Sequence, residues 1–275
     1  MVGVAAVGRW IRQVVRDASR LLFPDYCVSC GRRLTVREEA LCAECYFSLP
    51  FTGIRGAAGN AVERLFWGRF PIGRASAFLY YVPNSKTRLP FIRLKYHKRP
   101  HVGRFFGKAM ARDLVDTGFF EGMDGIVPLP LAPSRLRQRG YNQSAELARG
   151  ISMVTGLPIY GDVVERIVAN PTQTRLSNTE RRENVRNIFR LCNAERICGR
   201  HILLVDDILT SGSTVLSCAG ELARAEGVTI SVLVMGMARH HHVLRTMKHV
   251  KVETSLDILP EDNDVVEVGD YQSGK

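Results

Sequence analysis

Short apolar runs alternate with segments of helical periodicity from residue 75 to about residue 239, and no other feature of the sequence limits the possible folds as strongly. The apolar runs have the length of strands, and the segments between them are long enough to cross over a sheet. Regular alternation of this kind predicts an α/β domain with a parallel sheet and crossover helices. The expected strands are residues 76–82, 124–131, 201–207 and 229–239, and the expected helices are residues 87–97, 103–116, 142–156 and 213–227.

The chain has 275 residues, of which 45% are hydrophobic, and this suffices for one main domain with a small appendage. The first residues place apolar side chains near helical spacing between arginines, whereas the last segment is acidic and poor in large apolar residues. The expected organisation is an amphipathic helix at 1–22, a cysteine-rich module at 23–52, a Gly-, Ala- and Arg-rich linker at 53–74, the main α/β domain at 75–245 and a C-terminal extension at 246–275.

No stretch approaches the run of about 18 apolar residues that a membrane span needs, and the first residues lack the pattern of a secretory signal. We therefore expect a cytoplasmic protein without a membrane span. The net charge of +11 predicts a surface that attracts phosphate groups. From Lys86 to Arg112 the chain carries nine basic residues and no acidic one, which indicates either contact with an anionic partner or a solvated face.

Four cysteines form the first chemical motif, "CVSCGRRLTVREEALCAEC". Two C-x-x-C pairs at this distance present four thiolates to one Zn²⁺ ion, and Gly31 permits the tight turn that follows the second cysteine. Two disulfides are the alternative, but they are rare in a reducing compartment. With four protein ligands the zinc would be structural. The predicted ligands are Cys27, Cys30, Cys42 and Cys45.

An apolar run, "HILLVDD", ends in two consecutive carboxylates and passes directly into "ILTSGST". Ligands of parallel sheets bind beyond the carboxyl ends of the strands, where Asp206 and Asp207 are expected to lie. Hydroxyls and a glycine before a helix that starts near Thr214 offer N–H donors and the positive end of the helix dipole to a phosphate. Carboxylates that accept from vicinal hydroxyls, next to a phosphate cradle, suit a sugar phosphate.

Two other kinds of site also end an apolar strand in acidic residues. A Walker B strand needs a phosphate-binding loop, but "GDYQSGK" at Gly269 to Lys275 lacks the Ser or Thr and a following helix. The acidic pocket of a receiver domain lacks the Thr-Ser-Gly-Ser-Thr run after its acids. Both alternatives are therefore weaker than the sugar-phosphate site.

The segment "LLVDDILTSGST" resembles the phosphoribosyl-pyrophosphate (PRPP) signature of type I phosphoribosyltransferases. Three further segments, "LKYHKRP", "VPLPLAPSRLRQRGYNQSAELA" and "NPTQTRLSNTERRENVRNIF", are similar to those of the ComF family, whose members begin with a four-cysteine zinc ribbon. The similarity spans about residues 23 to 240. It implies a type I phosphoribosyltransferase fold for the main domain, a zinc ribbon at 23–52, and a connection with DNA uptake and natural transformation.

The resemblance also implies roles for individual residues. Asp206 and Asp207 would hold the ribose hydroxyls of PRPP, and Arg135, in "PLPLAPSR", would lie near the diphosphate. Residues 171–187 would form a hood over the reacting centre, and Mg²⁺ would accompany PRPP because hard oxygen atoms are its preferred ligands. The expected 5′-phosphate ligands are Thr210, Ser211, Gly212, Ser213 and Thr214, and the hood arginines are Arg175, Arg181 and Arg182.

Two hypotheses about function follow. The first is a Mg²⁺-dependent phosphoribosyltransferase that moves ribose 5-phosphate from PRPP to an unidentified acceptor. The second is a non-catalytic module on the same fold, which senses PRPP or binds single-stranded DNA and cooperates with proteins of the DNA-uptake machinery. Basic and aromatic side chains that alternate along the chain suit single-stranded nucleic acid. The residues expected to bind it are Lys95, Tyr96, Lys98, Arg99, Arg137, Arg139 and Tyr141.

Overall fold

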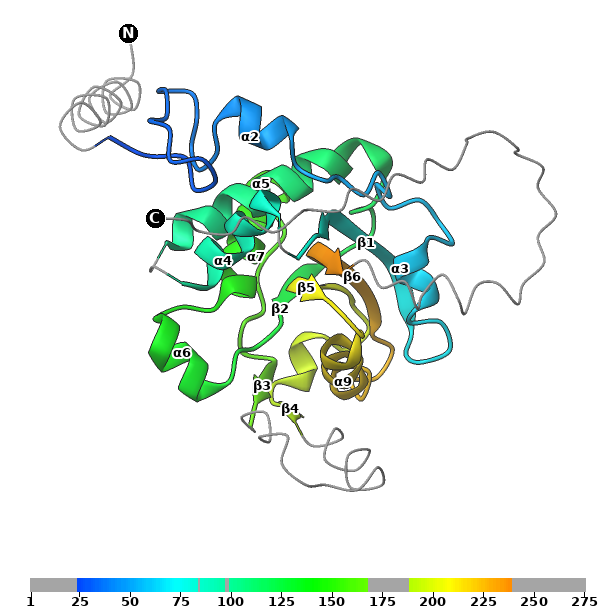
Figure 1. Cartoon of the computed structure of the whole chain (residues 1–275). Coiled ribbons are helices and arrows are strands. Elements are labelled where there is room, and N and C mark those ends of the chain that lie inside the picture. Colours follow the sequence, from blue (N-terminus) through cyan, green and yellow to red (C-terminus); the bar gives the residue numbers. More distant parts are fainter. Residues whose placement is uncertain (1–23, 84, 97–98, 168–187, 239–275) are drawn as a thin grey trace, which may run out of the picture. The chain divides into compact units, whose positions relative to one another are not determined.

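The computed structural model describes residues 24–83, 85–96, 99–167 and 188–238, and the structural statements below concern these residues. They contain a four-stranded parallel sheet in the order β1-β6-β5-β2 (Figure 1). Each of its strands falls on one of the four apolar runs expected from the sequence. The strands are β1 (Ile72–Tyr81), β2 (Gly125–Pro128), β5 (His201–Leu209) and β6 (Thr229–Ala238).

The helices between these strands also fall on the expected segments. They are α4 (Leu89–Lys95), α5 (Pro100–Leu114), α7 (Gln143–Thr155) and α9 (Ser213–Leu222). The predicted α/β class, with a parallel sheet flanked by helices, is therefore confirmed. None of the helices in the described residues combines the length and the apolar character needed to cross a membrane.

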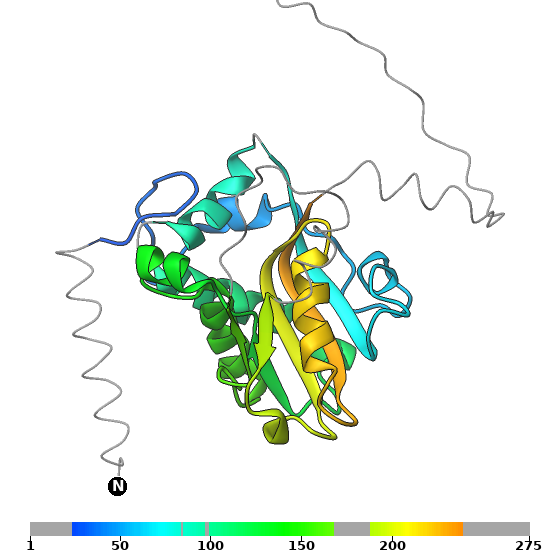
Figure 2. The same ribbon diagram turned by 90° about the horizontal axis from the view of Figure 1, so that it is seen from below.

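Successive residues of the central strands face two separate cores. Leu203 and Val205 of β5 pack in one cluster with residues of α5 and α7, whereas Ile202 and Leu204 pack in another with residues of α9. Side chains of a strand alternate between its two faces, so a sheet covered on both sides needs apolar residues at every position. Figure 2 shows the strands side by side, with α5 and α7 on one side and α9 on the other. This explains why the strands read as continuous apolar runs.

Several short elements were not expected from the sequence. A strand of three residues is too short for an alternation of polar and apolar residues to be recognised in the sequence. A helix without buried residues, such as α6, shows no apolar stripe. The antiparallel pair β3 and β4 flanks residues 168–187, which lie outside the described residues. These elements are α2 (Ala43–Phe47), α3 (Ala61–Arg64), α6 (Pro133–Arg139), β3 (Val164–Arg166), β4 (Phe189–Leu191) and the 3₁₀ turns Lys86–Arg88, Val115–Thr117 and Ala194–Arg196.

Residues 53–74, the expected linker, contain α3 and the first residues of β1. Val62 and Phe66 in this segment are fully buried, in the cluster that also includes α9. A helix of four residues is too short to show a period, which is why the segment looked irregular. The domain boundaries themselves stay predictions, and residues 1–22 and 246–275 lie outside the described residues.

Helices α5 and α7 approach each other closely at two glycines. A Cβ atom on Gly107 of α5 would overlap the carbonyl oxygen of Leu147, and one on Gly150 of α7 would overlap that of Arg104. Because the obstacle in each case is backbone, neither helix can yield by rotating a side chain. These glycines therefore set the distance between the two helices that cover one face of the sheet.

We expect Gly107→Ala to lower the free energy of unfolding by about 3 kcal/mol, the upper end of the usual cost of overpacking, because the added methyl meets backbone. Gly220→Ala in α9 is the control, since no atom lies within 4 Å of its Cβ position. It should raise stability by roughly 1 kcal/mol through helix propensity. Urea unfolding of both variants measures the difference, and equal stability of the two variants would contradict the packing account.

Candidate functional site

Strand β5 has one open edge at the position of the two carboxylates. Its neighbour β2 pairs with it only as far as Pro128, opposite Val205, and the backbone N–H of Leu129 makes the last hydrogen bond, to the Val205 carbonyl at 2.9 Å. On the other side β6 continues to pair with β5 as far as Leu209. Asp206 and Asp207 thus lie within β5, which runs two residues beyond the expected strand 201–207 because the longer strand β6 extends the pairing.

The two carboxylates have different partners. Asp206 accepts hydrogen bonds from the Ser144 hydroxyl at 3.1 Å and from the Asp207 backbone N–H at 2.8 Å. Asp207 forms an ion pair with the Lys95 ammonium group at 3.1 Å. Burial, together with the neighbouring charge of Asp207, raises the pKa of Asp206 to about 7, and these hydrogen bonds offset only part of the effect. Near neutral pH the pair therefore carries less than two full negative charges.

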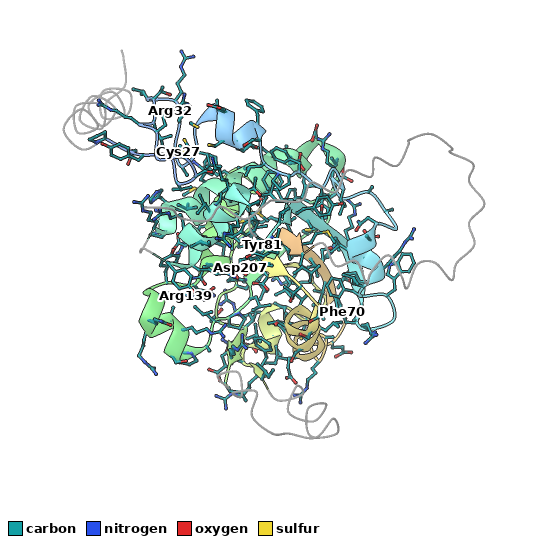
Figure 3. The ribbon with its side chains drawn as sticks, viewed as in Figure 1. Cys27, Arg32, Phe70, Tyr81, Arg139 and Asp207 are labelled. Atoms are coloured by element: carbon teal, nitrogen blue, oxygen red, sulfur yellow. The ribbon has the colours of Figure 1, made fainter. Side chains whose placement is uncertain are left out.

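A polar cavity of about 140 Å³ opens beside these carboxylates. Its wall contains four cationic side chains and two carboxylates, and this excess of positive charge favours an anionic ligand. Figure 3 labels Asp207 on β5 and Arg139 at the end of α6, both of which line the cavity. The lining residues are Lys95, Leu129, Pro130, Leu131, Arg135, Arg139, Asn142, Gln143, Ser144, Arg166, Asp206, Asp207, Ile208 and Thr214.

The loop between β5 and α9 turns at a glycine, and its predicted role as a phosphate cradle stays a prediction. Gly212 precedes the helix with φ of 77°, a left-handed conformation that favours glycine, and the side chain of Phe66 lies 3.4 Å from its Cβ position. The side chains of Thr210, Ser211 and Ser213 are exposed. Of the five residues predicted to bind the 5′-phosphate, Thr214 lines the cavity itself.

The structure therefore brings together part of the predicted site. Asp206, Asp207, Arg135 and Thr214 line one cavity. The predicted hood residues Arg175, Arg181 and Arg182 lie outside the described residues, so their roles stay predictions.

The segment "RGYNQS" (residues 139–144) joins α6 to α7 next to the cavity, and most of its side chains have a structural role. Gly140 ends α6 in a left-handed conformation, with φ of 81°. Asn142 caps α7 by accepting from the Ser144 N–H at 3.1 Å, and its amide donates to the Leu129 carbonyl at 3.0 Å. Tyr141 donates its hydroxyl to the Leu94 carbonyl at 2.6 Å, and burial raises its pKa. Its hydroxyl is therefore used within the fold, and the expected stacking of its ring on a nucleic-acid base stays a prediction.

Several residues of the cavity had no predicted role, or a different one. Lys95 and Arg139, which were expected to bind DNA, line the cavity, where the Lys95 ammonium group pairs with Asp207. Gln143 and Ser144 lie in the segment "VPLPLAPSRLRQRGYNQSAELA", but neither was predicted to bind a ligand. Arg166 lies on the three-residue strand β3, outside any motif, and no signal in a single sequence marks it. Its position could be found only from the pairing of β3 with β4.

The four predicted metal ligands form a cluster near the start of the chain. Their sulfur atoms all lie within 4.8 Å of one another, and the sulfurs of Cys30 and Cys42 are 3.8 Å apart. Four sulfurs bound tetrahedrally to zinc at about 2.3 Å lie about 3.8 Å from each other, so the cluster fits this ion. Gly31 has the expected positive φ, at 75°. Cys27 and Cys45 complete the set, and no pair among the described cysteines forms a disulfide.

The backbone favours the thiolate form at Cys27, whereas burial and hydrogen bonds with Cys42 and Cys30 raise the pKa of the Cys45 thiol to about 12. Burial raises the pKa of the Cys27 thiol, but hydrogen bonds from the backbone of Cys30, Cys42 and Ser29 outweigh that effect and lower the pKa to about 7. Glu38 holds the loop between the pairs, since its carboxylate accepts from the N–H groups of Thr35 and Ala43 at 2.8 Å each.

Comparison with known proteins gives the chain its family. Competence protein F of Haemophilus influenzae is 28% identical over 229 residues, which cover 78% of this chain and 96% of that protein. The DNA utilization protein YhgH of Shigella flexneri is 30% identical over 209 residues, which cover 75% of this chain and 87% of the relative. The chain belongs to the ComF family. No protein-family model matches this ComF-family chain.

Solved structures resemble the ComF-family chain over about half of its length. A glutamine PRPP amidotransferase from B. subtilis has a TM-score of 0.34 and 19% identity, and the match covers 48% of this chain and 25% of that one. A hypoxanthine phosphoribosyl transferase of Trypanosoma cruzi has a TM-score of 0.32 and 16% identity, with 52% and 67% covered. At these values neither similarity assigns a role to a residue of this chain.

We expect the ribbon to lose its metal and its fold in Cys42→Ser, because structural zinc in small modules contributes roughly 10–16 kcal/mol to folding. Cys218→Ser is the control: this thiol is also fully buried, but it lies in α9, outside the cluster. Atomic emission should find one zinc per chain in the wild type and in Cys218→Ser, and none in Cys42→Ser. Wild-type protein without zinc after purification in the absence of chelators would refute the assignment.

Proposed function

We propose that this ComF-family protein binds PRPP in the polar cavity and acts in the uptake or use of DNA. The observation that carries the proposal is the cavity itself, in which an acidic pair and an excess of cations lie beside the loop that precedes α9. A sugar phosphate with a diphosphate group has the complementary arrangement of hydroxyls and anions. The connection with DNA is proposed from the relatives, which are named for competence and DNA utilization.

In this proposal each part of PRPP has its own ligands. The carboxylates of Asp206 and Asp207 accept from the ribose hydroxyls, and binding requires Lys95 to share or release Asp207. Residues 210–214 donate to the 5′-phosphate from the N-terminus of α9, where the helix dipole favours an anion. Arg135 contributes positive charge toward the diphosphate.

Mg²⁺ fits the chemistry of these ligands. The acidic pair presents carboxylate oxygens, which this ion prefers, and its remaining ligands would come from PRPP and water. When bound with PRPP, the ion would neutralise part of the diphosphate charge. Asp206 and Asp207 are the described cavity residues that could hold it.

The reaction that suits this site is transfer of ribose 5-phosphate to an acceptor, with breakage of the C1–O bond to pyrophosphate. Positive charge builds up on the ribose and negative charge on the departing pyrophosphate, so cations at the diphosphate and exclusion of water both favour it. Arg175, Arg181 and Arg182 are proposed to contact the pyrophosphate from the segment 171–187.

We expect the double variant Asp206→Ala/Asp207→Ala to bind PRPP at least 10-fold more weakly and to unfold no more easily than the wild type, since it removes repulsion between two partly buried carboxylates. The matched control is Asp113→Ala/Asp116→Ala, which also removes two carboxylates, at the surface near Arg55. Calorimetry with PRPP and Mg²⁺ measures both. Equal affinities in the two double variants would reject the proposed ribose site.

Binding of single-stranded DNA is a second candidate function, favoured by an exposed aromatic ring next to the cavity residue Arg139. Tyr96 is 52% exposed, and the guanidinium of Arg139 lies 5.8 Å from the centre of its ring. An exposed ring beside a cation is the arrangement on which bases stack. Arg137 is exposed on α6, whereas Lys98 lies outside the described residues.

We expect Tyr96→Ala to weaken binding of single-stranded DNA by about 1–3 kcal/mol with an unchanged salt dependence, because stacking displaces no counterions. Tyr26→Ala is the control, since Tyr26 is exposed to the same degree, 53%, but lies in the ribbon. Salt titrations of fluorescent DNA, with and without PRPP, measure the affinity and its salt dependence. Absence of binding at low salt would remove this candidate, and loss of all binding with saturating PRPP would show that DNA merely occupies the PRPP cavity.

A further inference from the structure

The amide of Gln143 is buried in the cavity with only one end satisfied. Gln143 is the first residue of α7, is 2% exposed and lines the cavity. Its Oε1 atom accepts a hydrogen bond from the Arg139 guanidinium at 2.8 Å. Within the described part of the chain, its Nε2 group is buried and has no hydrogen-bond partner. Buried polar groups in proteins are nearly always paired, so a buried unpaired donor in a cavity indicates a ligand.

The contact with Arg139 also decides which end of the amide is free. A guanidinium only donates hydrogen bonds, so the group that faces it must be the amide oxygen. The opposite assignment would place two donors against each other. The group left for a ligand is therefore the NH₂, which calls for an acceptor atom.

The cavity around this amide is rich in positive charge. Arg166 is a buried arginine, 9% exposed, whose guanidinium lies 5.4 Å from the centre of the Phe189 ring. Burial lowers the pKa of Arg166, the nearby charge of Arg135 lowers it further, and the Asp206 carboxylate offsets only part of this effect. An anionic ligand between the two guanidiniums would reduce their repulsion. A group that carries several negatively charged oxygens meets both requirements, the acceptor and the anion.

We propose that Gln143 donates through its side-chain amide to an oxygen of the diphosphate group, in a subsite that Arg135 and Arg166 complete. The proposal rests on PRPP as the ligand of the cavity. This diphosphate subsite is separate from residues 210–214, which are proposed to bind the 5′-phosphate. Gln143 is thus a binding residue for the leaving group, and it connects that group to α7, whose next residue, Ser144, holds Asp206.

The test compares inorganic pyrophosphate with ribose 5-phosphate, each titrated with Mg²⁺ into the full chain by calorimetry. Gln143→Met keeps the length of the side chain and removes the donor, so pyrophosphate should bind roughly 10- to 100-fold more weakly while ribose 5-phosphate binds as before. Gln143→Glu keeps an acceptor for Arg139 and replaces the NH₂ by a carboxylate oxygen. It should fold like the wild type and lose more pyrophosphate affinity than Gln143→Met.

Unchanged pyrophosphate affinity in both variants would overturn the inference, as would a parallel loss of both ligands in variants with native thermal stability. If Gln143→Met is unstable, the pyrophosphate and ribose 5-phosphate affinities of Gln143→Glu alone decide whether the inference holds. A wild type that binds ribose 5-phosphate but not pyrophosphate would remove the subsite and leave the 5′-phosphate loop in place. A wild type that binds neither these ligands nor PRPP would instead reject the proposed function.

Discussion

Two neighbouring carboxylates on a buried strand repel each other, and much of the described structure is arranged around the pair Asp206 and Asp207. Strand β2 pairs with β5 only as far as Val205, one residue before the two aspartates. That edge of β5 therefore faces a cavity and not another strand. Lys95 from α4 and Ser144 from α7 each satisfy one carboxylate. Even so, burial keeps the pKa of Asp206 near 7. A site that retains this cost, beside a further excess of cations, is better explained by a ligand than by stability, because apolar residues would fill the same space without repulsion.

The α/β class was predictable because both faces of the sheet are covered, which leaves continuous apolar runs in the sequence. The cluster of four cysteines was also predictable, since its chemistry depends on residues close together in the chain. The remainder of the cavity was not. Lys95, Gln143 and Arg166 come from three separate elements, and only the packed structure brings them to one wall. The length of β5 was underestimated for the same reason: its last residues are extended by pairing with β6, a contact between distant segments.

The ribbon is tied to the helices that cover the sheet, so it is not an independent appendage. Cys27, Val28, Leu41 and Cys42 belong to the same buried cluster as residues of α5 and α7, and Lys108 of α5 forms an ion pair with Glu39. Loss of the metal would therefore disturb the packing of α5 and α7, and α7 carries Gln143 and Ser144. In this account the zinc supports the cavity from a distance, through packing, and takes no part in its chemistry.

The central claim is that the cavity at the open edge of β5 holds PRPP, and a crystal structure of the protein with PRPP and Mg²⁺ tests it most directly. The account predicts electron density with the ribose hydroxyls at Asp206 and Asp207, the 5′-phosphate at residues 210–214, and the diphosphate beside Arg135, Gln143 and Arg166. PRPP bound elsewhere, or a cavity that stays empty at saturating PRPP while the crystals remain intact, would contradict it.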